Sequence, residues 1–173
     1  MKNTLLVICL LAFTIPGFSQ ESARSVRTIP SVTVQDVNGH KINTKDLNNN
    51  GKPIIISFWA TWCKPCISEL TTISEVYSDW QKETGVKMIA VSIDDARSSA
   101  KVLPMVNAKA WENEVLLDQN GDFKRALNVN AVPHTFLING KGEIVWQHTS
   151  FIEGNELELI ELVRKLEAGL PLE

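Results

Sequence analysis

The stretch Trp59–Cys66, WATWCKPC, decides how the rest of this chain is interpreted. Before it stands a nearly unbroken apolar run, residues 54–58, typical of a strand that is covered on both faces. After it, apolar residues recur at spacings of three and four over residues 67–82, which predicts a helix. Cys63 and Cys66 are therefore expected where a strand meets a helix N-terminus. Unpaired N–H groups and the helix dipole favour a thiolate there, so the pair is predicted to be a redox-active dithiol.

The first 19 residues have the layout of a secretory signal peptide. One lysine precedes an apolar segment from Leu5 to Phe13, and a turn with small residues follows. Pro16 and Gly17 end this segment well short of the roughly 20 apolar residues that span a bilayer, which argues against a membrane anchor. We expect a loose, polar lead-in over residues 20–30 and one domain over residues 31–173, because 173 residues suffice for a single sizeable core.

The composition and the number of cysteines exclude several classes of function. The formal net charge is -3 and the sequence has no basic run, so we expect no nucleic-acid partner. The third cysteine, Cys9, lies in the expected signal peptide, which leaves Cys63 and Cys66 in the mature chain. A small exported domain held together by disulfides would show four or more cysteines. Stability must therefore come from the apolar core, and the pair is free for chemistry.

The remaining elements are predicted from apolar periodicity and turn residues. Asn38-Gly39 predicts an N-terminal hairpin, and residues 87–93 predict a second buried strand, parallel to the first. Asp94 or Asp95 is expected to cap an inserted helix that runs to about Lys109, kinked or shortened at Pro104. The apolar stripe of the helix after Cys66 is predicted to comprise Ile67, Leu70, Ile73, Val76 and Trp80. The later elements are a strand at 115–117, a short helix at 123–127, a hairpin of 135–138 with 144–147, and a last helix at 156–168.

Together these elements predict an α/β fold with a central mixed β-sheet flanked by helices. The chain resembles the thioredoxin superfamily in three places: the stretch 59–66, the remote Val132-Pro133 pair, and residues 135–138 after it. The signal peptide, the N-terminal hairpin and the inserted helix make the chain more similar to its exported branch, the TlpA/ResA-like thiol–disulfide oxidoreductases. The similarity spans roughly residues 30–166. It implies a thioredoxin-like fold and exchange of a dithiol with the disulfides of other proteins.

The resemblance assigns roles to individual residues. Cys63 would attack a substrate disulfide and Cys66 would resolve the mixed disulfide, which agrees with the better thiolate stabilisation expected at the helix start. Pro133 would be a cis-proline that faces the dithiol, and the backbone of Val132 would pair with the substrate. Trp62 is expected on a flat apolar surface that accepts substrates, whereas Trp59 is expected in the core.

Two residues between the cysteines are expected to tune the dithiol. Pro65 fixes φ in the first helical turn, and by resemblance a proline in this place goes with reducing members. Lys64 places a cation beside the pair, which would stabilise the thiolate and make the disulfide more oxidising; it could equally be a solvated surface lysine. The direction of electron flow stays open, with a reductase favoured over an oxidase.

Glu69 is the expected proton acceptor. It follows Cys66 by three residues and so lies one helical turn on, on the same side. Thioredoxin has a buried aspartate beneath its cysteines where this chain has Ser57, whereas the TlpA/ResA branch has a glutamate that matches Glu69. The resemblance thus implies proton exchange between Glu69 and Cys66, with a raised pKa for Glu69 if it is buried. The alternative is a solvated glutamate on the polar face of the helix.

The leading hypothesis is an exported thiol–disulfide oxidoreductase that keeps particular cysteines reduced, for instance before haem attachment to c-type cytochromes. The expected partners are cysteine-containing protein substrates and a membrane-bound or exported thiol reductant that donates electrons. We expect a monomer with no metal and no cofactor besides the Cys63–Cys66 disulfide.

Competing hypotheses differ in the residues they need. A thiol peroxidase would want a threonine three residues before the reactive cysteine and a nearby arginine, but Thr61 is only two before Cys63. A copper-binding assembly module of the Sco type would have three residues between its cysteines, where this chain has two, and a downstream histidine such as His134. We expect His134 to be a satisfied histidine rather than a catalytic one near the dithiol. A zinc site needs four ligands, and His40, His134 and His148 have no ligand spacing. A structural disulfide or a non-catalytic scaffold would leave the dithiol without chemistry.

Overall fold

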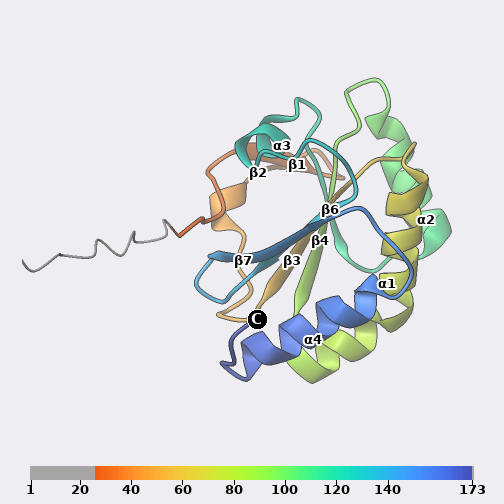
Figure 1. Cartoon of the computed structure of the whole chain (residues 1–173). Helices are drawn as coiled ribbons and strands as arrows, with labels where there is room; N and C mark the ends of the chain where they lie inside the picture. The colour runs from red at the N-terminus through yellow and green to blue at the C-terminus, as the bar shows by residue number, and fades with distance from the viewer. Residues whose placement is uncertain (1–25, 173) are drawn as a thin grey trace, which may run out of the picture.

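A seven-stranded mixed sheet forms the centre of the molecule, with the strand order β2-β1-β5-β4-β3-β6-β7 (Figure 1). The structure is a computed structural model and describes residues 26–172; the expected signal peptide lies outside the described residues. The strands are β1 (Thr33–Asp36), β2 (Lys41–Asn43), β3 (Ile54–Trp59), β4 (Lys87–Ser92), β5 (Glu114–Leu117), β6 (His134–Ile138) and β7 (Ile144–Thr149). The helices are α1 (Lys64–Thr84), α2 (Val102–Lys109), α3 (Asp122–Ala126) and α4 (Asn155–Glu167).

Strand β3 lies in the interior of this sheet and delivers the dithiol. It pairs in parallel with β4 and antiparallel with β6, and all six of its residues are buried. The predicted continuous apolar run is thus a strand covered on both faces. The chain leaves β3 at Trp59 and enters α1 at Lys64, so the dithiol lies at the end of an interior strand.

Alternate residues of β3 point into two separate apolar clusters. Ile55 and Trp59 pack on one face with residues of α1, α2 and α4, and the Trp59 ring meets that of Trp111 edge to face, with centroids 5.2 Å apart. Phe58 points to the other face, where its ring centroid lies 5.1 Å from that of Phe123 in α3. Figure 1 shows α1 and α4 side by side over the first face. The strand that leads to the dithiol is therefore held between two cores, and α1 packs on the first of them.

Helix α1 is longer than predicted, and its buried stripe differs at one position. Leu70, Ile73 and Trp80 are buried as expected and Ile67 is partly buried against them, but Val76 is 36% exposed and Tyr77 is buried instead. At 3.6 residues per turn, the position four after Ile73 continues the inner stripe better than the position three after it. The Tyr77 hydroxyl also accepts the N–H of Met88 at 2.9 Å, which ties the helix to β4.

The inserted helix begins later than predicted. Asp94 and Asp95 do not cap it, because α2 starts only at Val102, after a short 3-10 turn over Ser99–Lys101. Pro104 therefore lies in the first turn of α2, where a missing N–H is tolerated. Asp95 instead holds the preceding turn by accepting the N–H of Ser98 at 3.0 Å.

The described end of the lead-in is also less loose than predicted. Thr28 forms a β-bridge with Glu143, and the Ile144 N–H donates to the Arg27 carbonyl at 2.8 Å. Ile29 is buried, and covering this apolar side chain explains why the segment packs against the β6–β7 hairpin. Across residues 26–172, none of the helices is both long enough and apolar enough to cross a membrane.

Candidate active site

The two cysteines form a disulfide at the N-terminus of α1, with an S–S distance of 2.03 Å. Cys63 is the N-cap residue, and its Sγ accepts the N–H of Cys66 at 3.3 Å. Cys63 is 6% exposed and Cys66 is fully buried. Cys63 is therefore the outer sulfur, and an anionic Cys63 would receive this N–H bond together with the favourable end of the helix dipole.

The loop between β3 and α1 is anchored by Asp94, which sequence analysis placed elsewhere. The buried Asp94 carboxylate accepts the Thr61 N–H at 2.8 Å and the Thr61 hydroxyl at 2.7 Å. The Ser92 hydroxyl also donates to it at 2.9 Å. These three donors satisfy the buried carboxyl oxygens and fix Thr61, the residue that precedes Trp62 and Cys63.

A second loop faces the outer sulfur. The Val132–Pro133 peptide bond is cis, and the Val132 carbonyl oxygen lies 3.7 Å from Cys63 Sγ. Trp62, next to Cys63, is 66% exposed. The structure thus brings together the four residues that the sequence assigned to substrate attack and substrate contact. Lys64 and Pro65 are the first two residues of α1, and both are exposed.

Glu69 is buried beneath the dithiol rather than solvated on the helix surface. It is 5% exposed, and two hydroxyl groups contact its carboxyl: Ser57 at 2.9 Å and Thr135 at 2.8 Å. Burial raises the pKa of Glu69 above its ordinary value, and the hydrogen bonds from Thr135 and Ser57 oppose that rise in part. This arrangement keeps a proton on the carboxyl at a higher pH than in water.

His134 lies on the far face of the sheet from Glu69. Its ring stacks on Phe136 with centroids 4.5 Å apart, and Phe136 belongs to the cluster that packs against α3. Burial lowers the pKa of His134, with smaller contributions from the charges of Arg27 and His148. Among residues 26–172, no three His, Cys, Asp or Glu side chains gather in an arrangement that could hold a metal ion.

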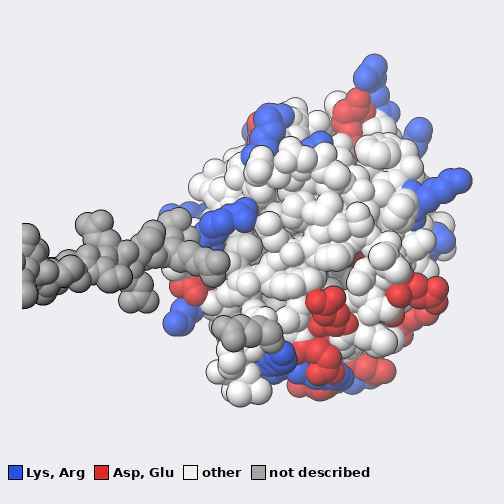
Figure 2. Space-filling model, viewed as in Figure 1, with Lys and Arg blue, Asp and Glu red and all other residues white. Residues whose placement is uncertain are grey.

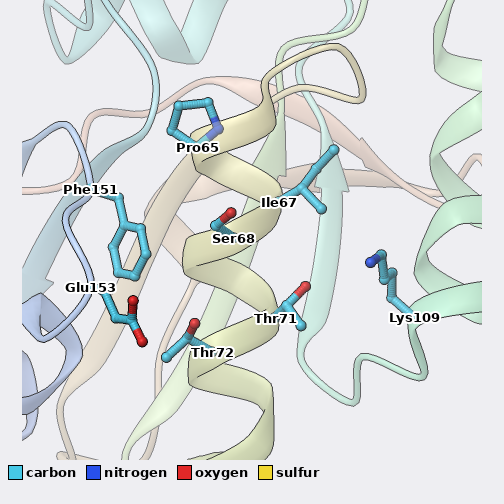
Figure 3. Close-up of a pocket in the computed structure, with 8 residues that line it drawn as sticks. All are labelled: Pro65, Ile67, Ser68, Thr71, Thr72, Lys109, Phe151 and Glu153. Atoms are coloured by element: carbon cyan, nitrogen blue, oxygen red, sulfur yellow. The ribbon is translucent and has the colours of Figure 1, made fainter.

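A groove of about 520 Å³ runs along the solvent side of α1, beginning at Pro65 (Figure 3). The helix floor of the groove bears the hydroxyls of Ser68, Thr71 and Thr72. Figure 3 shows Phe151 and Glu153 on one side of this helix and Lys109 on the other. The groove thus begins at the N-terminal turn of α1, where the dithiol lies.

Sequence reasoning missed the contribution of Thr135 and Asp94. Thr135 is one of two polar residues in a buried five-residue strand, a signal that something polar lies above it. Asp94 stands at the end of an apolar strand, where it is equally consistent with a helix cap. Asp94 contacts a residue 33 positions away in the sequence, and Thr135 contacts one 66 positions away. Local residue spacing does not indicate contacts at such separations.

Comparison with known proteins agrees with this geometry. The AhpC/TSA family profile matches residues 26–147. The thiol–disulfide oxidoreductase ResA of Bacillus subtilis (strain 168) is 31% identical over 144 residues, which cover 82% of this chain and 78% of ResA. ResA of Bacillus anthracis is 32% identical over 157 residues, with 84% and 88% covered. The solution structure of a thioredoxin-like protein from Porphyromonas gingivalis is 53% identical, with a TM-score of 0.73 over 81% of this chain and 92% of that one. A cysteine pair at the helix start, a buried glutamate and these relatives place the chain in the thioredoxin-like AhpC/TSA family, as a thiol–disulfide oxidoreductase of the ResA type.

Proposed function

We propose that this chain is an exported reductase of protein disulfides, which exchanges its Cys63–Cys66 dithiol with cysteine-containing proteins. The observation that supports this most is the pairing of an outer sulfur at a helix N-terminus with a buried carboxyl beneath it. The helix N-terminus favours the thiolate form of Cys63, and the carboxyl of Glu69 takes up a proton. Both are needed for the two successive steps of disulfide exchange.

In the first step, the Cys63 thiolate attacks one sulfur of a substrate disulfide. A bond forms between Cys63 and that sulfur, the substrate S–S bond breaks, and the other substrate sulfur leaves as a thiolate. The exposed Trp62 ring offers an apolar contact beside the reacting sulfur. The carbonyl of Val132, 3.7 Å from Cys63 Sγ, is positioned to pair with an extended substrate backbone.

In the second step, Cys66 resolves the mixed disulfide. The Cys66 thiol gives its proton to the Glu69 carboxylate, and the resulting thiolate attacks Cys63 Sγ. The substrate is released as its second thiolate, so the substrate gains two electrons and the dithiol loses them. Cys66 is fully buried and needs an internal proton acceptor, and Glu69 is one helical turn away on the same side.

We also propose that electrons flow from the dithiol to its substrates and that the protein acts outside the cytoplasm. Pro65 between the cysteines favours a reducing dithiol by resemblance, and the signal-peptide layout of residues 1–19 favours export. We assign as substrates the disulfides of c-type apocytochromes, and as electron donor a membrane-bound or exported dithiol protein. The protein would act as a monomer, with the dithiol as its one redox group. Figure 2 shows acidic side chains over α4 and a largely uncharged face above it, which suits protein partners better than nucleic acid.

The test uses a synthetic peptide that contains a CxxCH segment with its two cysteines joined as a disulfide. The pre-reduced protein is mixed with this peptide, and reduced peptide is measured over time by thiol labelling and mass spectrometry. We expect stoichiometric reduction by the natural sequence and mixed disulfide alone with Cys66→Ser. Cys63→Ser should be inactive. A pre-reduced protein that leaves the peptide oxidised would contradict the reductase proposal.

The same protein preparations distinguish the proposed reductase from a thiol peroxidase and from a copper-binding module. A thiol peroxidase would consume hydrogen peroxide without reducing the peptide, but the residue three before Cys63 is the buried Ala60, which offers no hydroxyl to a peroxide. A copper module would bind copper tightly in a manner that depends on His134. The ring of His134 stacks on Phe136 on the opposite face of the sheet, so we expect His134→Asn to leave any copper binding unchanged.

A further inference from the structure

Three polar residues form a row across the sheet beneath α1. Ser57 on β3 is in register with Thr135 on β6, and Thr135 is in register with His148 on β7. Residues in register on neighbouring strands point to the same face, with Cβ atoms about 5 Å apart. Because β7 is an edge strand, the row leads from the buried floor of the dithiol to the side of the molecule.

A small cavity lies where this row meets Glu69. Its volume is about 10 Å³, close to the space that one water molecule needs. Its lining includes Glu69 and Thr135, which are buried, and Trp146, His148 and Glu156, which are partly exposed. The His148 ring stacks on Trp146, with centroids 5.7 Å apart, which fixes the imidazole at the rim.

The hydroxyl hydrogens around Glu69 indicate when its proton must move. Ser57 and Thr135 each contact the Glu69 carboxyl, and their oxygens lie 3.1 Å from each other. Two hydroxyl hydrogens can satisfy only two of these three contacts. A third hydrogen, on a protonated Glu69, completes the ring. With the disulfide formed, Glu69 therefore holds the proton that Cys66 gave up, and the transfer from Cys66 becomes irreversible once that proton leaves for solvent.

We infer that His148 is the outer end of a proton path that runs from Glu69 past Thr135 and through one water molecule in the cavity. This inference rests on the proposed role of Glu69 in proton exchange. The Glu69 O–H gives its proton to the water, the water gives a proton to the His148 imidazole, and the imidazole releases one to solvent. An imidazole is suited to this because it has two ring nitrogens, so it can accept a proton at one and release a proton from the other.

The other charged groups around the cavity define the controls. Glu156, on α4, borders the same cavity, but its Oε2 accepts the Gly154 N–H at 2.9 Å. His134 is excluded as an exit because it lies on the opposite face, stacked on Phe136. Phe151 lines both the cavity and the groove along α1, so its ring separates Glu69 from that groove.

The test measures resolution of a mixed disulfide by stopped-flow tryptophan fluorescence, with the pre-reduced protein and saturating oxidised glutathione at neutral pH. We expect His148→Phe to slow the concentration-independent phase about tenfold, within the lower range of acid–base effects. Added imidazole buffer should restore the rate, which a purely structural defect would not show. His148→Gln, which retains a polar side chain, should behave like His148→Phe. Glu156→Gln should resolve at the natural rate.

A further variant is designed to open a second path for the proton of Glu69. Phe151→Ala removes the ring between the cavity and the groove, so in combination with His148→Phe it should recover part of the lost rate. His148 variants that resolve at the natural rate, without a response to imidazole, would overturn the inference and mean that the proton stays between Cys66 and Glu69. If Glu156→Gln slows resolution of the mixed disulfide, the inference is overturned and Glu156 is the outer end of the proton path. If Glu69→Gln is also unimpaired, the failure lies in the role proposed for Glu69 and not in the path.

Discussion

At Glu69, two opposing effects act on one carboxyl group. Loss of water disfavours the charged form, while two neutral hydroxyl donors favour it. Burial outweighs the two donors, because an ion loses several kcal/mol of hydration and a neutral hydrogen bond returns about 1 kcal/mol. The pKa therefore rises, and the carboxyl keeps its proton at a higher pH than an exposed glutamate does.

Replacing this carboxyl with an amide should slow the second step of exchange. In Glu69→Gln no group beneath Cys66 accepts its proton, and we expect resolution to fall about 100-fold at neutral pH. The loss should shrink as the pH rises, since hydroxide can then deprotonate the thiol. Rapid-quench analysis of the mixed disulfide measures this step. The matched control is Glu75→Gln, an exposed glutamate on the same helix, which should have no effect. Equal rates for the two variants would contradict the role of Glu69.

Local motifs predicted the cysteine pair at the helix start, and distant contacts completed the candidate site. Cys63, Cys66 and Pro65 occupy adjacent positions at a helix start, where spacing alone indicates the chemistry. Thr135 and Ser57, by contrast, meet Glu69 only because β6 pairs with β3 under α1. No periodicity in the sequence specifies that pairing, so the ring of hydroxyls around the carboxyl could not be predicted.

At the scale of elements, the β3–α1 loop depends on β4 for its conformation. The carboxylate of Asp94, just beyond β4, receives both donors of Thr61 and so fixes the loop that leads to Cys63. Sequence analysis predicted a helix cap here because an aspartate before a helical pattern is usually a cap. The α2 helix starts eight residues later, since the turn after Asp94 uses Asp95 to hold its own N–H groups.

Weakening this anchor should destabilise the fold. In Asp94→Asn the amide nitrogen cannot accept a hydrogen bond, which leaves a buried donor of Thr61 or Ser92 without a partner. We expect a loss of about 2 kcal/mol in the free energy of unfolding, measured by urea denaturation of the oxidised protein. Asp79→Asn, at an exposed position of α1, should change stability by less than about 0.5 kcal/mol. A destabilisation no larger than that of the control would mean that Asp94 does not anchor the loop.

At the scale of the whole molecule, the buried Glu69 links stability to pH. Below about pH 4.3 the carboxyl is protonated in both the folded and the unfolded chain and has no differential effect. Above that pH the unfolded chain releases the proton while the folded chain retains it. The free energy of unfolding should therefore decrease as the pH rises, by about 1.4 kcal/mol per pH unit, until the pH reaches the raised pKa of the folded state.

Urea denaturation of the oxidised protein over a pH series measures this effect. Glu69→Gln lacks the titration, so the difference in stability between the variant and the natural sequence should grow in favour of the variant across that window. The subtraction removes the contributions of all other groups that titrate alike in both proteins. A difference that stays constant with pH would show that Glu69 does not retain its proton on folding.

The reduction potential of the Cys63–Cys66 pair decides whether this dithiol reduces or oxidises its partners. The protein is equilibrated in thiol–disulfide buffers and followed by tryptophan fluorescence, with Cys63→Ser as the control. A reductase predicts a reversible two-electron transition at about -270 mV, close to that of thioredoxin. A transition at about -120 mV would contradict the proposed direction and indicate an oxidase. The absence of any reversible transition would mean that Cys63 and Cys66 are not a redox-active pair.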